Sequence, residues 1–312
     1  MILCCGEALI DFVPLAETGG YKPCPGGSVY NIAVGLGRLA APAGFFSQIS
    51  RDFFGDQLLA YLRANHVDTS YCLRSDDPTT LAFVSLPEEG SEPRFMFYAN
   101  DAADRRLLAR DLPELSQTVT ALHFGSISLV LKPGATALET LMRRESRRRI
   151  LSLDPNVRPG LIHNRDAYHR HFEEWVKLVD IIKLSRADFE YIYPHHSLDA
   201  MVARWLDAGA SLCLVTMGED GAVGYTSSGV TAAVTAPRVK VADTVGAGDT
   251  FLAAALAYLH THHQLTSRKQ LHTLPVADLA ACLTYAVRAA AINCMRQGAD
   301  PPTLHEMESI HV

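Results

Sequence analysis

The segment Asp243-Thr-Val-Gly-Ala-Gly-Asp249 is followed at once by the apolar run Thr250-Phe-Leu-Ala-Ala-Ala-Leu-Ala-Tyr-Leu259. A glycine-rich turn that opens a helix points several backbone N–H groups and the positive end of the helix dipole at one place, which suits a phosphate. This turn also carries a carboxylate, Asp249, in the first helical turn. Such a carboxylate can take a proton from a hydroxyl while that oxygen attacks phosphorus. Taken alone, the motif is also consistent with turn-forming glycines and a carboxylate that only complements the helix dipole.

The chain around this segment alternates strand-like and helix-like stretches after its first third. This alternation is typical of βαβ units, in which a parallel sheet is covered by helices on both faces. We therefore predict an α/β fold with three layers and a mainly parallel sheet, whose ligands bind beyond the carboxyl ends of the strands. The predicted strands are 121–125, 149–153, 180–184 and 212–216, and the predicted helices are 134–149, 165–179, 187–193 and 197–208.

Two regions interrupt this alternation. Residues 13–25 contain turn-forming residues and little helical periodicity. Residues 80–86 and 94–98 alternate like antiparallel strands joined by the polar turn 87–93. Together they predict a small β-sheet that projects from the core as an insertion. The predicted division assigns 1–12, 26–70 and 102–312 to the core, and 13–25 and 71–101 to the small sheet.

The composition argues against several classes of protein. The chain has 312 residues, a formal net charge of −6, 48% hydrophobic and 20% charged residues, so neither a nucleic-acid surface nor a membrane span is expected. The basic run 143–149 is interpreted as a solvated helix face. Seven scattered cysteines without zinc-ligand spacing indicate reduced thiols in a cytoplasmic protein, and no signal peptide is expected. His260, His262 and His263 are interpreted as surface residues.

Five motifs together resemble the carbohydrate kinases related to ribokinase and fructokinase. The segment 243–249 is similar to the C-terminal signature of that family, and Gly26-Gly-Ser-Val-Tyr-Asn31 opens a stretch similar to its N-terminal signature. Three further segments match family motifs in the family's order: Gly6-Glu-Ala-Leu-Ile-Asp11, Asp154-Pro-Asn-Val-Arg158 and Val215-Thr-Met-Gly-Glu-Asp-Gly221. The resemblance covers nearly the whole chain. It implies a ribokinase-like three-layer α/β/α core with a β-sheet lid over the sugar, and a homodimer formed through that lid.

The sugar is expected to lie against the ends of the first strand and first helix. Asp11 follows an apolar run, and a carboxylate there can accept one hydroxyl with each oxygen; the alternative is a simple strand-end turn. Gly26 and Gly27 precede an apolar helix, at a place where side chains would obstruct a ligand. Asn31, one turn into that helix, can donate and accept toward a hydroxyl. The predicted sugar-binding residues are Asp11, Gly26, Gly27, Asn31, Phe97 and Asn156.

The predicted reaction centre combines Asp249 as the general base with the backbone N–H groups of Gly246, Ala247 and Gly248 as an anion hole. Arg158 follows a buried strand, and its forked guanidinium can clamp a transferring phosphoryl group. The alternative for this arginine is a surface salt bridge. The resemblance places its position at the phosphate-transfer site.

The resemblance also implies ATP as the phosphoryl donor, together with Mg²⁺. Many relatives carry an Asn-x-x-Glu motif that organises magnesium and its waters, and this chain has Ser185 and Asp188 there. An indirect role in Mg²⁺ binding is therefore expected for Asp188. The turn after the strand 212–216 is expected near the phosphates and ribose, and a late helix near adenine. The predicted nucleotide-binding residues are Lys183, Ser185, Thr216, Gly218, Gly221 and Asn293.

A monovalent cation, typically K⁺, often lies beside the anion hole in the resembled family. Asp243 and the carbonyl of Val245 match two of its ligands. Pro302 stands where some relatives use a hydroxyl, so the match to this ligand set is incomplete. The implied cofactors are ATP, Mg²⁺ and K⁺.

The predicted reaction is the ATP-dependent phosphorylation of a primary hydroxyl, most simply of D-fructose to fructose 6-phosphate. The segment 93–107 resembles the lid-to-core passage of fructokinases. The closest competing substrate is 2-keto-3-deoxygluconate, whose kinases commonly carry an arginine where this chain has Ala99, although Arg105 or Arg106 could substitute. A riboside kinase and a catalytically silent sugar-binding protein on the same fold are also consistent with these motifs.

Overall fold

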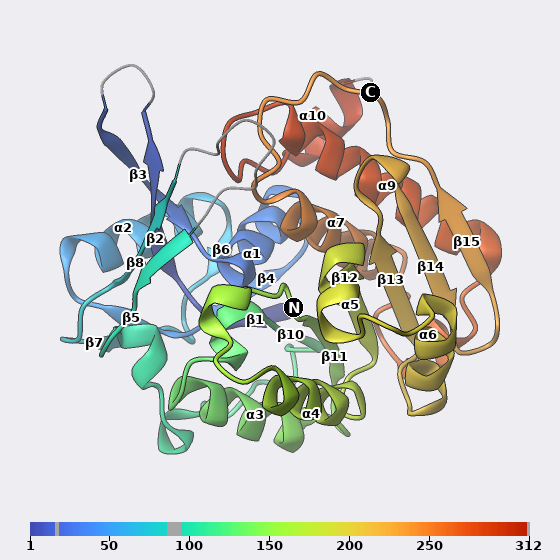
Figure 1. The fold of residues 1–312 in the computed structure, drawn as a ribbon, viewed down its shortest axis with the longest axis horizontal. Helices are drawn as coiled ribbons and strands as arrows, with labels where there is room; N and C mark the ends of the chain where they lie inside the picture. Colours follow the sequence, from blue (N-terminus) through green and yellow to red (C-terminus); the bar gives the residue numbers. More distant parts are fainter. Residues whose placement is uncertain (16–18, 86–94, 311–312) are drawn as a thin grey trace.

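The computed structural model describes residues 1–15, 19–85 and 95–310. Within these residues, a nine-stranded sheet with the order β15-β14-β13-β12-β11-β10-β1-β4-β6 runs through the molecule and is parallel except for β14 (Figure 1). Its strands are β1 (Ile2–Cys5), β4 (Ala43–Phe46), β6 (Val67–Asp68), β10 (Ala121–Gly125), β11 (Ile150–Asp154), β12 (Ile181–Ser185), β13 (Leu212–Thr216), β14 (Ala222–Thr226) and β15 (Thr231–Val234).

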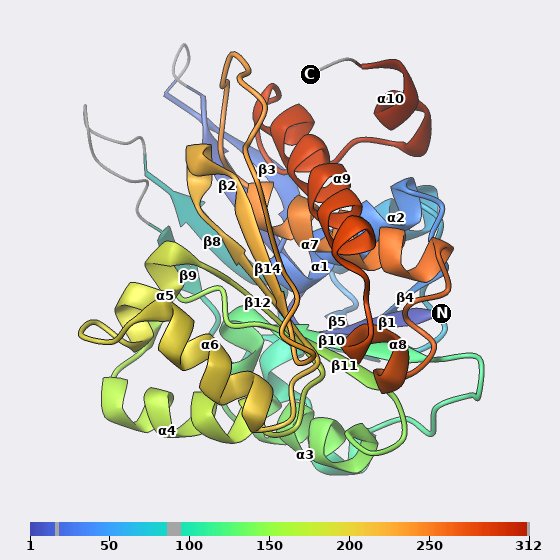
Figure 2. The same ribbon diagram turned by 90° about the vertical axis from the view of Figure 1, so that its right-hand side faces the viewer.

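Helices cover both faces of this sheet, as Figure 2 shows. Each face has its own hydrophobic core because successive side chains of a strand point to opposite sides; Leu3 belongs to one core and Cys4 to the other. The predicted three-layer α/β fold is therefore confirmed. One layer contains α1 (Ser28–Arg38), α2 (Phe53–Ala64), α7 (Ala247–Thr261) and α9 (Val276–Cys294), and the other contains α3 (Gly134–Glu145), α4 (Arg165–Val176), α5 (Arg186–Ile192) and α6 (Leu198–Asp207). The short helices α8 (Arg268–His272) and α10 (Leu304–Ser309) contribute Leu271 and Met307 to the same core as α7 and α9.

The helix α7 forms the centre of its layer. Its side chains from Thr250 to Ala257 are buried, because the helix packs against both α1 and α9. A helix that is apolar on all sides is typical of such a buried position. The consequence is a rigid helix whose N-terminus is held at the edge of the sheet.

The helix α9 is long and apolar enough to meet the length and composition test for a membrane span, with a mean hydropathy of 1.2. Half of that window is buried inside the structure, where α9 packs against α7, β14 and β15. The core of a soluble protein passes the same test, so the helix by itself is weak evidence for a span.

A second sheet of four strands projects from the core at the upper left of Figure 1. Its order is β3-β2-β8-β9, with β8 and β9 antiparallel as predicted and β2 parallel to β8. We call it the small sheet. Its predicted polar turn, 87–93, lies outside the described residues. The strands are β2 (Leu9–Pro14), β3 (Tyr21–Gly26), β8 (Thr80–Val84) and β9 (Phe95–Tyr98).

Two predicted boundaries of this sheet are wrong. The first core strand ends at Cys5, and residues 9–14 already belong to the small sheet, because the chain turns out of the large sheet at Gly6. At the other boundary, β7 (Leu73–Ser75) pairs with β5 (Gln48–Ser50) in a separate two-stranded sheet. Residues 71–79 therefore lead into the small sheet but do not form part of it.

The register of the small sheet sorts its side chains onto two faces. Asp11 pairs with Ala82, and Ala82 with Phe97, so these three side chains share the face that is turned toward the core. Phe12 and Phe83 lie on the opposite face, where their rings stack with a centroid distance of 4.6 Å. The inner face thus presents a carboxylate and an aromatic ring to whatever lies between the two sheets.

Candidate active site

A cavity of about 860 Å³ lies between the small sheet and the carboxyl ends of the central strands. Residues that directly follow β1, β10 and β11 line it, as expected for an open parallel sheet. The predicted residues that line it are Asp11, Gly27, Asn31, Phe97, Asn156, Arg158, Val245, Gly246, Gly248 and Asp249. The others are Glu7, Leu9, Ser28, Met96, Ser126, Ile127, Val157, Pro159, Gly160, Leu161 and Thr244.

The carboxylate of Asp249 is the polar centre of this cavity. It accepts hydrogen bonds from Ser28 Oγ at 2.7 Å, from Asn31 Nδ2 at 2.9 Å and from Asn156 Nδ2 at 3.2 Å. The side chains of Ser28 and Asn31 meet it together because they stand three residues apart on α1. These three donors hold the carboxylate in one orientation, facing the space that a ligand would occupy.

The sequence motifs did not point to Ser28 or Glu7. Ser28 Oγ accepts from Asn156 Nδ2 at 2.6 Å while it donates to Asp249, so it joins two residues that were predicted. Glu7 is 1% exposed, and its Oε1 accepts from the backbone N–H of Val29 at 3.3 Å, which fixes the start of α1. Burial raises the pKa of Glu7, with hydrogen bonds acting in the opposite direction. Both residues could have been identified from the sequence, because Glu7 directly follows Gly6 and Ser28 directly follows Gly27 within the two glycine-containing motifs.

The loop before α7 has the geometry of an anion-binding turn. Gly246 is the N-cap and has φ = 74°, a left-handed conformation that suits glycine. The N–H of Ala247 donates to the carbonyl of Thr244 at 3.2 Å, so Ala247 is turned away from the cavity. The next backbone N–H groups, those of Gly248 and Asp249, stand in the first turn of α7, where no intrahelical acceptor exists. Gly246 and Gly248 line the cavity, the N–H of Ala247 is already bonded within the turn, and the anion hole formed by Gly246, Ala247 and Gly248 stays a prediction.

A buried ion pair lies directly behind this loop. Lys183 Nζ is 2.7 Å from Asp154 Oδ2, and the two side chains are 3% and 0% exposed. Burial alone would lower the pKa of Lys183, but the carboxylates of Asp154, Asp188 and Asp249 together outweigh it and hold this pKa above its ordinary value. A Cβ atom added at Gly248 would lie 2.9 Å from Lys183 Nζ. The ammonium therefore adds positive charge beside the N-terminus of α7, although Lys183 itself does not line the cavity.

Asp11 and Arg158 also line the cavity. A Cβ atom at Gly26 would lie 2.1 Å from Asp11 Oδ2, so only glycine leaves room for this carboxylate. Burial raises the pKa of Asp11 to about 7, the positive charge of Arg158 opposes this shift, and Asp249 adds to it. Arg158 Nη1 donates to Asn156 Oδ1 at 2.5 Å. Asn156 thus connects the arginine to the carboxylate of Asp249.

Ser185 and Asp188 do not line the cavity. They form a capping box at the start of α5, in which Ser185 Oγ donates to Asp188 Oδ2 at 2.6 Å. The other oxygen, Asp188 Oδ1, accepts from the backbone N–H of Val157 at 2.7 Å. Asp188 therefore anchors the loop that carries Asn156 and Arg158, and its indirect role in Mg²⁺ binding stays a prediction.

The remaining predicted nucleotide residues lie outside the cavity. Thr216 ends β13 in register with Ser185, and Gly218 and Gly221 form the turn into β14 with φ = 61° and 98°. Asn293 is 0% exposed, and its Nδ2 donates to the carbonyl of Val245 at 2.8 Å. Asn293 thus supports the anion-binding loop, and its buried side chain is not open to a contact with adenine.

The predicted cation ligands Asp243 and Val245 lie close together, and the oxygens of both already accept hydrogen bonds within the chain. Asp243 Oδ1 accepts from the N–H of Val245 at 3.0 Å, and Asp243 Oδ2 accepts from the N–H of Gly298 at 2.8 Å. Within the described residues, no three His, Cys, Asp or Glu side chains gather as a metal site. A monovalent cation would therefore have to share the Asp243 oxygens with backbone N–H groups and the Val245 carbonyl with Asn293 Nδ2.

Comparisons with known proteins agree with this geometry. Residues 1–306 match the model of the pfkB family of carbohydrate kinases. A fructokinase of Rhizobium leguminosarum bv. trifolii is 42% identical over 274 residues, which cover 86% of this chain and 82% of that protein. The structure of fructokinase with bound ATP from Xylella fastidiosa has a TM-score of 0.90 and 28% identity, covering 99% of this chain and 97% of that one. Fructokinase from Vibrio cholerae O395, in a form with fructose, ADP and calcium ion, has a TM-score of 0.82 and 25% identity, covering 96% and 94%. The resemblance inferred from the five motifs is confirmed, and the chain belongs to the pfkB family of carbohydrate kinases.

Proposed function

We propose that this protein is an ATP-dependent fructokinase that converts D-fructose to fructose 6-phosphate. The observation that carries this proposal is the placement of Asp249, held by three donors, in the first turn of α7 beside the anion-binding loop. The 42% identity to a bacterial fructokinase supports the substrate, and the likeness to fructokinases with bound ATP or with fructose and ADP supports the two ligands.

In the proposed mechanism, fructose lies between Asp11 and Asp249. Asp11 accepts two sugar hydroxyls, and Phe97 covers an apolar face of the ring. Asp249 takes the proton of the primary hydroxyl while that oxygen attacks the γ-phosphorus, and the bond from this phosphorus to the bridging oxygen breaks so that ADP leaves. The N–H groups at the start of α7 stabilise the charge that develops on the phosphoryl oxygens. Arg158 shares this charge. Most of the rate enhancement comes from positioning, because a loose transition state requires the proton late.

We propose Mg²⁺ as the divalent cofactor and K⁺ as a monovalent one. When bound with ATP, Mg²⁺ neutralises charge on the phosphates. Asp188 fits only an indirect role toward it, since both of its oxygens already accept hydrogen bonds from the chain. K⁺ would be held by Asp243 and the carbonyl of Val245. We also propose a cytoplasmic location, which is supported by the seven free cysteines.

The cavity favours a neutral sugar over the acidic 2-keto-3-deoxygluconate. Among the described residues that line it, Arg158 is the one cation, beside three carboxylates. Arg105, a potential carboxylate partner, instead donates to the carbonyl of Lys132 at 2.9 Å. Arg106 lies within 3.4 Å of Asp77. Neither arginine lines the cavity.

A panel of acceptors in a coupled ADP-release assay tests the proposal. We expect fructose to give the highest kcat/KM, ahead of ribose, adenosine and 2-keto-3-deoxygluconate. A higher kcat/KM for any of these three would replace fructose as the substrate. Absence of ADP release with every acceptor, despite binding of ATP and sugar, would indicate a catalytically silent protein.

A Ser28→Ala variant should lower kcat about tenfold with little change in the KM for either substrate. The substitution removes one donor to Asp249 and leaves Asn156 without one of its acceptors, so the base is less well oriented. Steady-state kinetics of Ser28→Ala and Ser28→Thr check this, because threonine keeps the hydroxyl. Equal losses in both variants would show that Ser28 acts only through packing.

The sugar KM should depend on pH through Asp11. Because the pKa of this carboxyl is raised to about 7, it is mostly protonated below that pH and accepts sugar hydroxyls poorly. We expect the KM for fructose to rise by up to about tenfold per pH unit as the pH falls below 7. The same raised pKa makes unliganded Asp11 lower the stability of the fold as the pH rises from about 4 to 7. An Asp11→Asn variant should bind fructose weakly at every pH; an unchanged KM profile in this variant would assign the titration to another group.

We further propose that the small sheet is a lid over the sugar and forms a homodimer contact. Its outer face exposes Tyr21 and Tyr98 by 46% and 57%, around the stacked pair of Phe12 and Phe83. A small sheet with apolar side chains on both faces is stable only when both faces pack against something. We propose that the sugar packs against the inner face and a second subunit against the outer face. A closed lid would also exclude water from the phosphoryl group.

Two measurements check these proposals separately. Hydrogen exchange in β8 and β9 should slow when fructose is added, and an unchanged rate at saturating fructose would contradict the lid. In light scattering the protein should have the mass of a dimer, and Tyr98→Lys should give the mass of a monomer. Val276→Lys is the control, since Val276 is 56% exposed but lies on α9, far along the chain from the small sheet. Equal effects of both variants would contradict the dimer contact.

A further inference from the structure

Residues 298–301, which we call the supporting segment, pack directly against the anion-binding loop. A Cβ atom added at Gly246 would lie 2.6 Å from Ala299 Cβ, so the two stretches of chain are in close contact. The N–H of Gly298 donates to Asp243 Oδ2 at 2.8 Å. The start of the loop is therefore attached to the supporting segment by a hydrogen bond as well as by packing.

A second attachment runs through the end of α9. The N–H of Asp300 donates to Asn293 Oδ1 at 2.9 Å, and Asn293 Nδ2 donates to the carbonyl of Val245 at 2.8 Å. Asn293 is fully buried, and its amide is used on both sides, so a displacement of Asp300 would reach Val245 through one side chain. The position of the loop therefore depends on the position of the supporting segment.

Arg38 holds the supporting segment from its other side. It is the last residue of α1, where a basic side chain ordinarily complements the helix dipole. Here its Nη1 donates to Asp300 Oδ1 at 2.5 Å and to the carbonyl of Pro301 at 2.6 Å. The guanidinium thus binds the side chain of one residue and the backbone of the next, which fixes this part of the segment.

The guanidinium is itself fixed by contacts with α2 and the residue after it. Arg38 Nε donates to Asn65 Oδ1 at 2.6 Å, and Nη2 donates to Tyr61 Oη at 3.0 Å. All three guanidinium nitrogens are therefore engaged, and the side chain is only 16% exposed. A planar fork of donors can hold several acceptors at once, which a lysine ammonium on its flexible stem does less well. Arg38 joins α1, α2 and the supporting segment at one point.

We propose that Arg38 is a positioning residue that aligns the anion-binding loop with Asp249. Ser28 and Asn31, at the start of α1, donate to the carboxylate of Asp249. Arg38 stands about 15 Å further along the same helix and holds the segment that supports the loop. One rigid helix thereby sets the positions of both the base and the loop. The inference rests on the proposed kinase function, in which the loop receives the charge of the phosphoryl group.

An Arg38→Met variant tests the proposal by two measurements. Hydrogen exchange, which needs no turnover, should become faster in residues 243–249, because the supporting segment loses its attachment to α1. In steady-state kinetics kcat should fall roughly tenfold or more, since small misplacements of reacting groups are costly. The KM for fructose should stay close to that of the unmodified chain. Unchanged exchange in residues 243–249 would overturn the proposal whichever acceptor the enzyme uses, whereas absence of turnover in the unmodified chain would contradict the proposed function.

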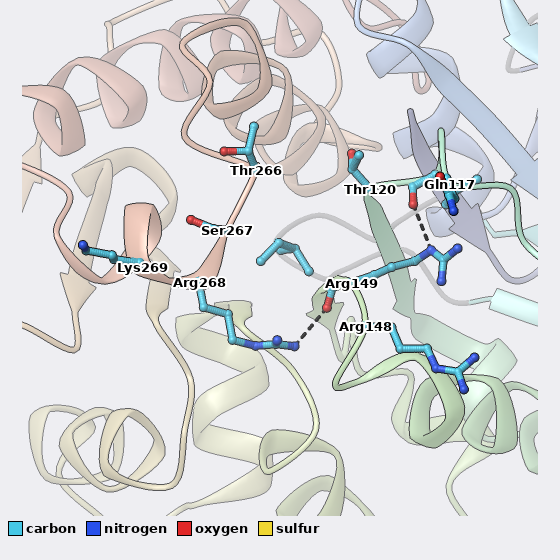
Figure 3. Close-up of a pocket in the computed structure, with 10 residues that line it drawn as sticks. Gln117, Thr120, Arg148, Arg149, Thr266, Ser267, Arg268 and Lys269 are labelled. Carbon is cyan, nitrogen blue, oxygen red and sulfur yellow. Dashed lines mark hydrogen bonds between the residues drawn. The ribbon is translucent and has the colours of Figure 1, made fainter.

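Arg268→Met is the matched control. Arg268 likewise pairs with a carboxylate, that of Asp180 at 2.5 Å, and donates to a backbone carbonyl, that of Arg149 at 3.0 Å (Figure 3). These contacts lie where β11 and β12 begin, at the opposite ends of the strands from the active site. The control should unfold at a lower temperature but keep its kcat and its exchange in residues 243–249. Equally faster exchange in both variants would show a general loss of stability and would overturn the proposal.

An Asp300→Ala variant interrupts the same connection from the other side. It leaves Arg38 in contact with Asn65 and Tyr61, and it applies the same exchange test if Arg38→Met does not fold. We expect kcat to fall by a factor similar to that in Arg38→Met. The double variant should lose no more than either single variant, because neighbours in one network are not additive. Losses that multiply in the double variant would mean that the two residues act independently, against the proposal.

Discussion

An Asp249→Asn variant is expected to lose roughly 10²–10⁴ of kcat while its affinity for fructose and ATP stays close to that of the unmodified chain. The amide keeps the shape of the carboxylate and one acceptor oxygen for the donors that surround it, but it cannot take the proton of the attacking hydroxyl. The loss should therefore appear in kcat, because the base acts only as the transition state forms. Single-turnover kinetics and calorimetric binding of each substrate measure the two effects separately.

Asp278→Asn provides the control for this variant. Asp278 also lies in the first turn of a helix, α9, and accepts a hydrogen bond from Gln264 at 3.0 Å, but it does not line the active-site cavity. Its kcat should be unchanged. Turnover near the unmodified rate in Asp249→Asn would show that another group, or water, accepts the proton.

Replacement of Lys183 by methionine should have the second large effect. It removes the ammonium and leaves Asp154, which is 0% exposed, without its partner. Breaking one side of a buried ion pair costs about 3–5 kcal/mol of stability. The variant should therefore unfold at a clearly lower urea concentration. It should also bind ATP more weakly, because positive charge behind the anion-binding loop is lost.

A double variant, Asp154→Asn with Lys183→Met, separates these two consequences. Removal of both charges relieves the buried carboxylate, so much of the stability should return. The weaker binding of ATP should persist, since the ammonium is still absent. Recovery of both stability and ATP binding would mean that Lys183 only neutralises Asp154 and contributes nothing to the anion hole.

The sequence predicted the parts of the site that depend on local geometry. The glycine turn before α7 and the glycine pair before α1 impose helix starts, and each carries its polar residue, Asp249 or Asn31, within one turn. The alternation of strands and helices similarly predicted the layers. These features depend on neighbours in the chain, which a sequence displays directly.

Features that depend on distant contacts could not be predicted in this way. Ser28 meets Asp249 across 221 residues of sequence, and only the packing of α1 on α7 brings them together. Asn293 was assigned to adenine, whereas the packing of α9 buries it beneath the anion-binding loop. The departure of the chain from the large sheet after β1 was not predicted, because Gly6–Ala8 is only a short link between the apolar runs of β1 and β2. The alternation of Asp11 with Ile10 and Phe12 was the available signal.

The junction of the small sheet with α1 has a consequence for how such an enzyme changes its acceptor. β3 ends at Gly26 and α1 begins at Ser28, so a single residue separates the strand opposite Asp11 from the helix that orients Asp249. An insertion at this joint would shift the specificity surface and the proton acceptor by the same displacement. The choice of acceptor and the alignment of the base therefore depend on the same connection and change together. Directed evolution toward a new acceptor should accordingly substitute side chains on the inner face of the small sheet and keep the length of this connection.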